Sequence, residues 1–220
     1  MINIQQQQKL LINIAENLPR NIEAYAIGGT GMIFHGLKDS TLDVDIVFRN
    51  AEDRRIFRET ALSLGFKGTK AEIIYGNKDN IPQMVALSDV RIDLFLLKII
   101  SSNFSEGMQK RATQIHEFAD KLFIKAADPI DIIIMKSVTS RDKDLDDIVS
   151  IINKTKINWK LLIEESNEQV KLGNESAILN LGEKLEKLSN QKVIIVPKDI
   201  LDKLWKLLNK QVKAKGKKKK

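Results

Sequence analysis

The sequence predicts an α+β protein, with a mixed sheet flanked by helices in its N-terminal half and only helices in its C-terminal half. Up to about residue 100, short apolar runs typical of strands alternate with stretches of helical periodicity. After Ser101 helical periodicity dominates. The 220 residues are enough for one large domain or two small ones. We therefore expect an α/β domain over residues 1–100 and a helical domain over residues 101–212.

The charge is concentrated at the C-terminus. The formal net charge is +7, but the last eight residues, 213–220, carry six positive charges, so the rest of the chain is close to neutral. Such a block of like charge is usually a disordered, solvated tail and only sometimes a nucleic-acid contact. We expect residues 213–220 to be disordered.

The composition also excludes several classes of protein. The chain has no cysteine, which excludes disulfides, thiolate metal sites and cysteine nucleophiles. Its apolar runs are too short to span a bilayer, and its N-terminal residues lack the apolar core of a signal peptide. We expect a cytoplasmic protein without a membrane segment; the sequence does not indicate the oligomeric state.

The first expected elements surround a pair of glycines. Residues 5–17 predict a helix, because their apolar side chains recur on one face and Pro19 follows. A short strand over Ala24–Ile27 then leads into the Gly28-Gly29 turn, and a short apolar helix follows it.

The next expected strand, Leu42–Phe48, carries two carboxylates. Alternation places Asp43, Asp45 and Val47 on one face and the apolar residues between them on the other. Adjacent carboxylates on an apolar strand repel each other and resist desolvation, and a divalent cation would relieve both problems.

A helix and a hairpin complete the predicted α/β domain. Asn50 is a suitable N-cap for a helix that ends at Gly65. Gln83–Leu87 and Val90–Leu97 predict a hairpin closed by Ser88 and Asp89. Helical periodicity then covers six stretches, which are Phe104–Ala119, Pro129–Ser140, Leu145–Ile152, Trp159–Val170, Ser176–Leu188 and Ile200–Val212.

Asp93 lies in the middle of the second hairpin strand. If this strand lies beside Leu42–Phe48, Asp93 joins Asp43 and Asp45 in a site of three carboxylates, which suits Mg²⁺ or Mn²⁺. Each residue alone has a plainer interpretation: the first two acids can be solvated on an edge strand, and Asp93 can pair with Arg91 or Lys98.

The Gly28-Gly29 turn fits the same chemistry. Without Cβ atoms its backbone can approach a ligand closely, and Thr30 adds a hydroxyl at the expected N-cap of the following helix. A phosphate held here, opposite a carboxylate-bound pair of metal ions, is the arrangement that nucleotidyl transfer requires. An ordinary glycine turn is the alternative.

The order of these elements resembles the signature of the DNA polymerase β-like nucleotidyltransferase superfamily. The resemblance covers residues 20–100 and consists of Gly28-Gly29, then Asp43 and Asp45 around one apolar residue, then Asp93 on a later strand. It implies a nucleotidyltransferase-type mixed sheet, metal binding by the three aspartates, NTP as substrate, and phosphate binding by Gly28, Gly29 and Thr30.

A second segment resembles an element of AbiEii-type nucleotidyltransferases, whose known members include toxins of toxin–antitoxin pairs. The matching residues are Lys136, Arg141, Lys143, Asp144 and Asp147. The resemblance implies that they face the nucleotide, and it favours tRNA as the acceptor, because some members modify tRNA. The sequence leaves a hydroxyl of a partner protein and a small antibiotic-like alcohol open as other acceptors. The plainer interpretation is a solvated charged face with local ion pairs.

Together these features predict a Mg²⁺- or Mn²⁺-dependent enzyme that transfers NMP from an NTP to a hydroxyl of RNA, tRNA or a protein. The alternative is a nucleotide- or RNA-binding module of the same fold that does not turn over.

Overall fold

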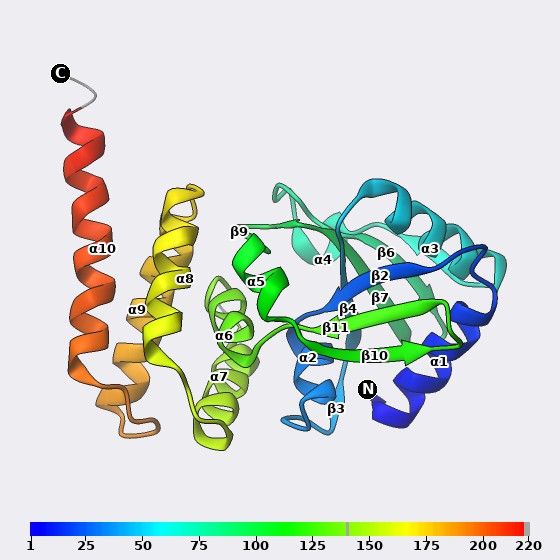
Figure 1. Cartoon of the computed structure of the whole chain (residues 1–220), viewed down its shortest axis with the longest axis horizontal. Coiled ribbons are helices and arrows are strands. Elements are labelled where there is room, and N and C mark those ends of the chain that lie inside the picture. The colour runs from blue at the N-terminus through cyan, green and yellow to red at the C-terminus, as the bar shows by residue number, and fades with distance from the viewer. Residues whose placement is uncertain (140, 218–220) are drawn as a thin grey trace. The chain divides into compact units, whose positions relative to one another are not determined.

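The computed structural model describes the backbone of residues 1–139 and 141–217, with side chains described to residue 209. The chain divides into two compact units, labelled by element in Figure 1. The first unit contains Met1–Ile100 and Glu106–Asp128, and the second contains Ser101–Ser105 and the residues from Pro129 onward.

The first unit is built on a seven-stranded mixed sheet in the order β10-β11-β2-β4-β7-β6-β5. The pairs β2–β11 and β4–β7 are parallel, and the other neighbours are antiparallel. The elements of this unit are β1 (Ile2–Asn3), α1 (Ile4–Glu16), β2 (Ile22–Ala26), α2 (Gly28–Phe34), β3 (Ser40–Thr41), β4 (Asp43–Phe48), α3 (Ala51–Ser63), β5 (Lys67–Thr69), α4 (Glu72–Tyr75), β6 (Gln83–Leu87), β7 (Val90–Leu96), β8 (Lys98–Ile99), α5 (Glu106–Arg111), β10 (Gln114–Phe118) and β11 (Leu122–Ala126). The expected fold class, a mixed sheet flanked by helices, is confirmed.

Helices α1 and α3 cover one face of this sheet. Val44, Ile46 and Phe48 of β4 are completely buried on that face, in one apolar cluster with residues of both helices. The Phe48 and Phe57 rings lie 5.3 Å apart between their centroids. Since side chains alternate along a strand, the opposite face of β4 carries Asp43, Asp45 and Val47, as predicted.

The local signals for α3 and for the hairpin were correct. The Asn50 side chain accepts a hydrogen bond from the Asp53 backbone N–H and caps α3, and Gly65 follows the helix with φ of +92°. Strands β6 and β7 pair in antiparallel register with Leu87 opposite Val90, so the turn contains Ser88 and Asp89.

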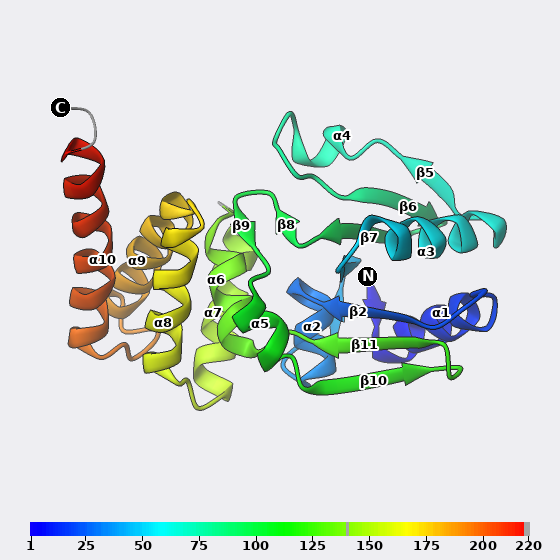
Figure 2. The same ribbon diagram turned by 45° about the horizontal axis from the view of Figure 1, so that its top comes forward.

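The predicted helix over Phe104–Ala119 is wrong. Only Glu106–Arg111 is helical, and Gln114–Phe118 forms the edge strand β10, which pairs with β11. Figure 2 shows β10, β11 and β2 side by side. The hairpin turn places Ala119 and Asp120 at positive φ without the glycine or asparagine that usually signals such a turn.

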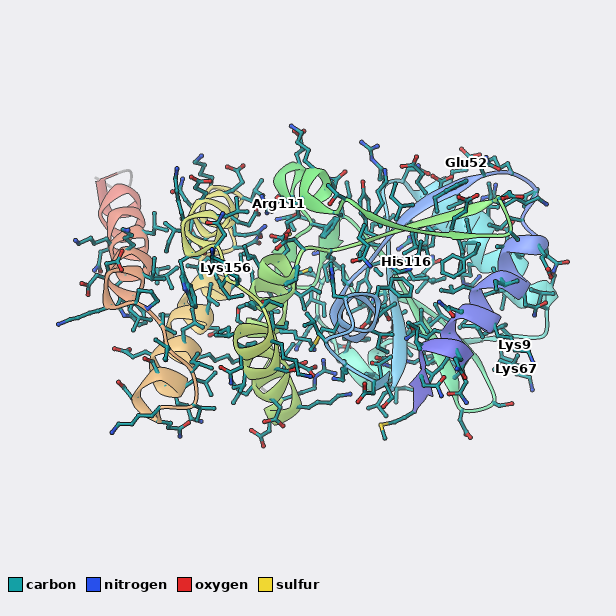
Figure 3. The ribbon with its side chains drawn as sticks, turned by 60° about the horizontal axis from the view of Figure 1, so that its bottom comes forward. Lys9, Glu52, Lys67, Arg111, His116 and Lys156 are labelled. Atoms are coloured by element: carbon teal, nitrogen blue, oxygen red, sulfur yellow. The ribbon has the colours of Figure 1, made fainter. Side chains whose placement is uncertain are left out.

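Because of β10 and β11, the first unit also extends further along the chain than expected. We expected the boundary near residue 100, whereas the first unit continues to Asp128, because β11 adds to the sheet beside β2. On β10, His116 stacks against Phe34 of α2 with ring centroids 4.0 Å apart, and Figure 3 labels this histidine.

The second unit is helical, as predicted. Its elements are β9 (Ser102–Asn103), α6 (Pro129–Ser137), α7 (Asp142–Lys154), α8 (Trp159–Lys171), α9 (Glu175–Asn190) and α10 (Lys198–Lys217). Helix α6 is buried along its length from Ile130 to Ser137, as expected for a helix enclosed by its neighbours α7, α8 and α9.

The C-terminal residues differ from expectation. Helix α10 continues to Lys217, so residues 213–217 of the expected disordered tail are helical, and residues 218–220 lie outside the described part of the chain. Within that described part, every helix is too short or too polar to cross a bilayer.

Candidate active site

The parallel pairing of β4 with β7 brings the three predicted aspartates together. In this register Asp45 is the partner of Asp93, and Asp43 is the partner of Arg91. One carboxylate oxygen from each of Asp43, Asp45 and Asp93 lies within 4.8 Å of the other two. The condition stated from the sequence, that the two strands be neighbours, is therefore met.

The three carboxylates differ in burial. The Asp93 side chain is completely buried, whereas Asp43 and Asp45 are partly exposed. Burial raises the pKa of the Asp93 carboxyl above its ordinary value, against the opposing effects of its hydrogen bond from Tyr75 and of the Arg91 charge. A buried carboxylate next to a second one requires a compensating cation.

Arg91 supplies a positive charge at this position. Its Nε donates to Asp93 Oδ1 at 2.8 Å, and its Nη2 donates to Asp43 Oδ2. The alternative that Asp93 pairs with Arg91 is thus observed, but as part of the cluster and not in place of it. One guanidinium does not neutralise three carboxylates, so a net negative charge remains.

Tyr75 completes the surroundings of Asp93. Its hydroxyl donates to Asp93 Oδ2 at 2.5 Å, and its ring meets the Phe95 ring edge-on with centroids 6.2 Å apart. Burial, and then the negative charges of Asp45 and Asp93, raise the pKa of Tyr75 far above its ordinary value. The phenol therefore stays protonated and acts as a donor. Sequence reasoning missed Tyr75, because the four-residue helix α4 carries no periodic signal.

These donors fit a divalent cation. Three converging carboxylates form an all-oxygen site of the kind that Mg²⁺ or Mn²⁺ prefers. The guanidinium of Arg91 already contacts two of the three carboxylates, which shows that their oxygens are arranged around a positive charge. Each of Asp43 and Asp93 uses one oxygen for Arg91.

The Gly28-Gly29 turn lies directly against Asp45. Gly28 has φ of +54°, and a Cβ there would lie 2.5 Å from Asp45 Oδ2. A Cβ on Gly29 would overlap the Thr41 side chain. Any residue other than glycine would therefore collide with Asp45 at position 28 and with Thr41 of β3 at position 29. This is the close backbone approach expected from the sequence.

Thr30 has a different position from the one we expected. Helix α2 begins at Gly28, so its N-cap is Ile27, and Thr30 lies inside the first turn. The Thr30 side chain is completely buried, and its Oγ1 accepts a hydrogen bond of 2.9 Å from the Asp45 backbone N–H. The hydroxyl thus fixes the strand that carries Asp45.

The charged residues of the second element form a compact ion cluster within the second unit. Lys136 Nζ lies 2.8 Å from Asp144 Oδ1 and 2.6 Å from Asp147 Oδ2, and all three side chains are buried. Arg141 Nε donates to Asp144 Oδ2 at 2.8 Å from an exposed side chain, and Lys143 is exposed. The plainer interpretation as local ion pairs is therefore observed for Lys136, Arg141 and Asp144.

The ion cluster shifts the pKa values of Lys136 and Asp144. Burial alone would lower the pKa of Lys136, but Asp144 and Asp147 raise it above its ordinary value. Burial alone would raise the pKa of Asp144, but the charge and hydrogen bond of Lys136 lower it to about 2. Lys136 and Asp144 are therefore both ionised at neutral pH and form a buried ion pair that joins α6 to α7.

A comparison with protein-family models gave a match over most of the chain. A family model described as nucleotidyltransferase of unknown function (DUF6036) matches residues 1–191. A search of curated proteins found no match. Among solved structures, the crystal structure of ANT(2")-Ia in complex with adenylyl-2"-tobramycin matches with a TM-score of 0.46 and 14% sequence identity, covering 82% of this chain and 98% of that one.

Proposed function

The chain belongs to the family of nucleotidyltransferases of unknown function (DUF6036), and we propose that it transfers a nucleoside monophosphate from an NTP to a hydroxyl acceptor with Mg²⁺ or Mn²⁺ as cofactor. The observation that carries this proposal is the convergence of Asp43, Asp45 and Asp93 beside the Gly28-Gly29 turn. A bound divalent cation would activate the attacking oxygen and stabilise the leaving pyrophosphate.

Each aspartate has a distinct part in this proposal. Asp43 and Asp45 would hold the cations, and Asp93 would hold one of them and accept the proton of the acceptor hydroxyl. The acceptor oxygen forms a bond to the α-phosphorus while the bond from that phosphorus to pyrophosphate breaks. Tyr75 and Arg91 orient the Asp93 carboxylate through its two oxygens.

The glycine turn would hold the β and γ phosphates of the donor. Without a Cβ, Gly28 lets the Asp45 carboxylate lie close to the backbone of the turn, so a cation held by Asp45 would lie next to phosphates bound there. Thr30 supports this arrangement by fixing the Asp45 backbone. Its buried hydroxyl therefore acts on the strand rather than on the phosphate.

The finer identity of the enzyme follows from the resemblance to AbiEii-type nucleotidyltransferases. On that basis the acceptor is RNA, tRNA or a protein, and the chain is one component of a toxin–antitoxin pair with a small partner protein. Lys136, Arg141, Lys143 and Asp144 would form the nucleotide-facing element. The exposed side chains of Arg141 and Lys143 suit contact with a triphosphate, and the buried Lys136–Asp144 pair would position them.

The decisive experiment removes one carboxylate without changing its size. We expect Asp43→Asn or Asp45→Asn to abolish the transfer of labelled NMP from each of the four NTPs into total RNA or lysate protein, while circular dichroism shows a folded chain. Asp39→Asn is the matched control, since Asp39 is an exposed carboxylate outside the cluster. Activity close to wild type in either cluster variant would refute the metal assignment.

One observation favours the alternative of a binding module. Arg91 already bridges Asp43 and Asp93, so the cluster is partly neutralised without a metal ion. Incubation with MnCl₂ and each labelled NTP separates the two functions, because a module binds the nucleotide without releasing pyrophosphate.

A further inference from the structure

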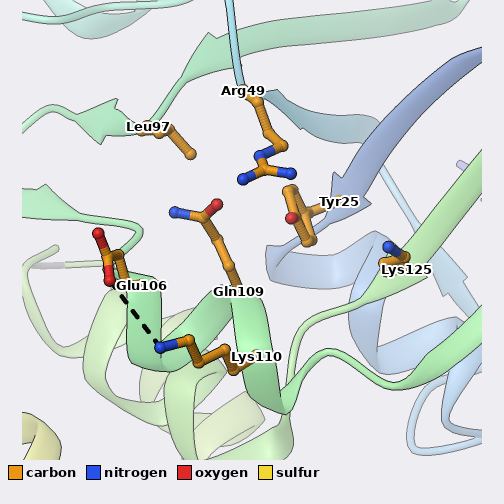
Figure 4. A pocket seen from close by; sticks show the side chains of 7 residues that line it. All are labelled: Tyr25, Arg49, Leu97, Glu106, Gln109, Lys110 and Lys125. Atoms are coloured by element: carbon orange, nitrogen blue, oxygen red, sulfur yellow. Dashed lines mark ion pairs between the residues drawn. The ribbon is translucent and has the colours of Figure 1, made fainter.

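A second feature on the aspartate face of the sheet is a cavity of about 600 Å³, shown in Figure 4. This size is typical of a ligand pocket. The cavity lies where β4 and β7 end, and α5 forms its other side. Its lining residues are Tyr25, Arg49, Leu97, Glu106, Gln109, Lys110 and Lys125.

The strand register places this cavity on the same face as the three aspartates. Tyr25 is the partner of Val47, and Lys125 is the partner of Tyr25. Val47 follows Asp45 by two residues and shares its face, and partners in register also share a face. Arg49 lies four residues after Asp45, which corresponds to about 13 Å along a strand at about 3.3 Å per residue.

The lining is positively charged above an apolar floor. Three cations, Arg49, Lys110 and Lys125, face one carboxylate, Glu106. Tyr25 is only 3% exposed and forms part of the floor. In Figure 4 the Gln109 amide extends from α5 toward the Arg49 guanidinium, so a hydrogen-bonding amide lies among the charges.

The ion pairs of these lysines are weak enough to yield to a ligand. Lys110 Nζ lies 3.9 Å from Glu106 Oε2, with the two side chains 81% and 90% exposed. Lys125 Nζ lies 2.8 Å from Glu23 Oε2, and the Glu23 side chain is 54% exposed. Exposed pairs of this kind contribute little, whereas a phosphate offers each cation a charge-assisted hydrogen bond.

The donor does not account for this charge. In the proposed function its α-phosphate lies at the aspartates and its β and γ phosphates at the Gly28-Gly29 turn. The three cations of the cavity are therefore available to phosphates of another molecule. A nucleic acid strand carries one at every residue, whereas a cationic acceptor would be repelled.

We propose that this cavity binds backbone phosphates of a single-stranded nucleic acid whose terminal hydroxyl is the acceptor. This inference rests on the proposed function and names its acceptor class. Arg49 and Lys125 hold the strand from the sheet, Lys110 holds it from α5, and the hydroxyl reaches the aspartates about 13 Å away along β4.

The test is a salt titration of binding without metal. A fluorescent single-stranded RNA of mixed sequence, and DNA of the same sequence, are titrated in EDTA with the full chain and with the variant Arg49→Gln/Lys110→Gln/Lys125→Gln. Each lost phosphate contact lowers the slope of log K against log salt by about 0.7 for single strands, so three contacts lower it by about 2. The basic C-terminus is present in every protein and contributes equally.

The matched control removes the same charge from residues that do not line the cavity. Lys9→Gln/Arg55→Gln/Lys67→Gln changes exposed residues of α1, α3 and β5, and should keep the wild-type slope. If the triple pocket variant does not fold, Lys110→Gln alone replaces it, since a side chain 81% exposed contributes little to the fold. Its expected slope change is about 0.7.

The outcomes are distinct. A pocket variant that keeps the wild-type slope, or a control that loses as much, overturns the inference. A variant that loses affinity for NTP and not for the oligonucleotide also overturns it, because the pocket then serves the donor. A wild-type chain that binds RNA through these residues but transfers no nucleotide supports the pocket and refutes the proposed function instead.

Discussion

Replacing Lys136 with Met would remove the buried cation that Asp144 and Asp147 share. Lys136 Nζ is within 2.8 Å of Asp144 and 2.6 Å of Asp147, and the three side chains are 9%, 2% and 8% exposed. Met fills a similar volume but carries no charge. The substitution therefore removes the ionic contacts and retains most of the packing.

The expected cost is large because of this burial. Removing one partner of a buried ion pair typically destabilises a protein by about 3–5 kcal/mol. For a chain of this length, each kcal/mol shifts the melting temperature by about 2–4 °C. We therefore expect Lys136→Met to lower the melting temperature of the chain by roughly 6–20 °C.

The assay is thermal unfolding followed by circular dichroism at neutral pH. Lys143→Met is the matched control, because Lys143 is an exposed lysine on the neighbouring helix α7. Adding Asp144→Asn and Asp147→Asn to Lys136→Met should recover part of the loss, since the buried negative charges that Lys136 offsets disappear. A Lys136→Met chain that melts within about 2 °C of wild type would refute a structural role, since the predicted loss is several times larger.

Three further predictions concern single side chains. Tyr75→Phe removes the hydroxyl that donates to Asp93 Oδ2, so a cation no longer competes with this hydrogen bond for the oxygen. Calorimetry should show that Mn²⁺ binds about tenfold tighter or more. An unchanged affinity would contradict this contact. Gly28→Ala places a methyl group at Asp45 Oδ2 and should abolish transfer, whereas Gly36→Ala, also at positive φ but with open space around it, should cost about 1–2 kcal/mol of stability and keep activity. The pKa of Asp144 is lowered to about 2, so this residue contributes stability above pH of about 4 that is lost as pH falls through about 2. Urea unfolding of Asp144→Asn should therefore show a flatter dependence of stability on pH over this range. An unchanged pH dependence would exclude the ion pair.

The sequence by itself determined the local features of the site. Alternation along Asp43–Phe48 assigned both acids to one face, and a strand of this kind has the same alternation in any fold. The glycine pair, the Asn50 cap and the hairpin turn were also readable, because each depends on a few adjacent residues. The order of these signals was enough to indicate the chemistry.

Only the tertiary structure decided which chain segments meet. Strand β7 pairs with β4 and aligns Asp93 with Asp45 because the apolar faces of both strands are buried together. The sequence of either strand alone does not specify this pairing. Tyr75 reaches Asp93 from a helix of four residues, and β10 joins the sheet through a turn that contains neither glycine nor asparagine. The basic cavity likewise combines side chains from β2, β11 and α5, which come from distant parts of the sequence, so its positive charge exists only in the folded unit.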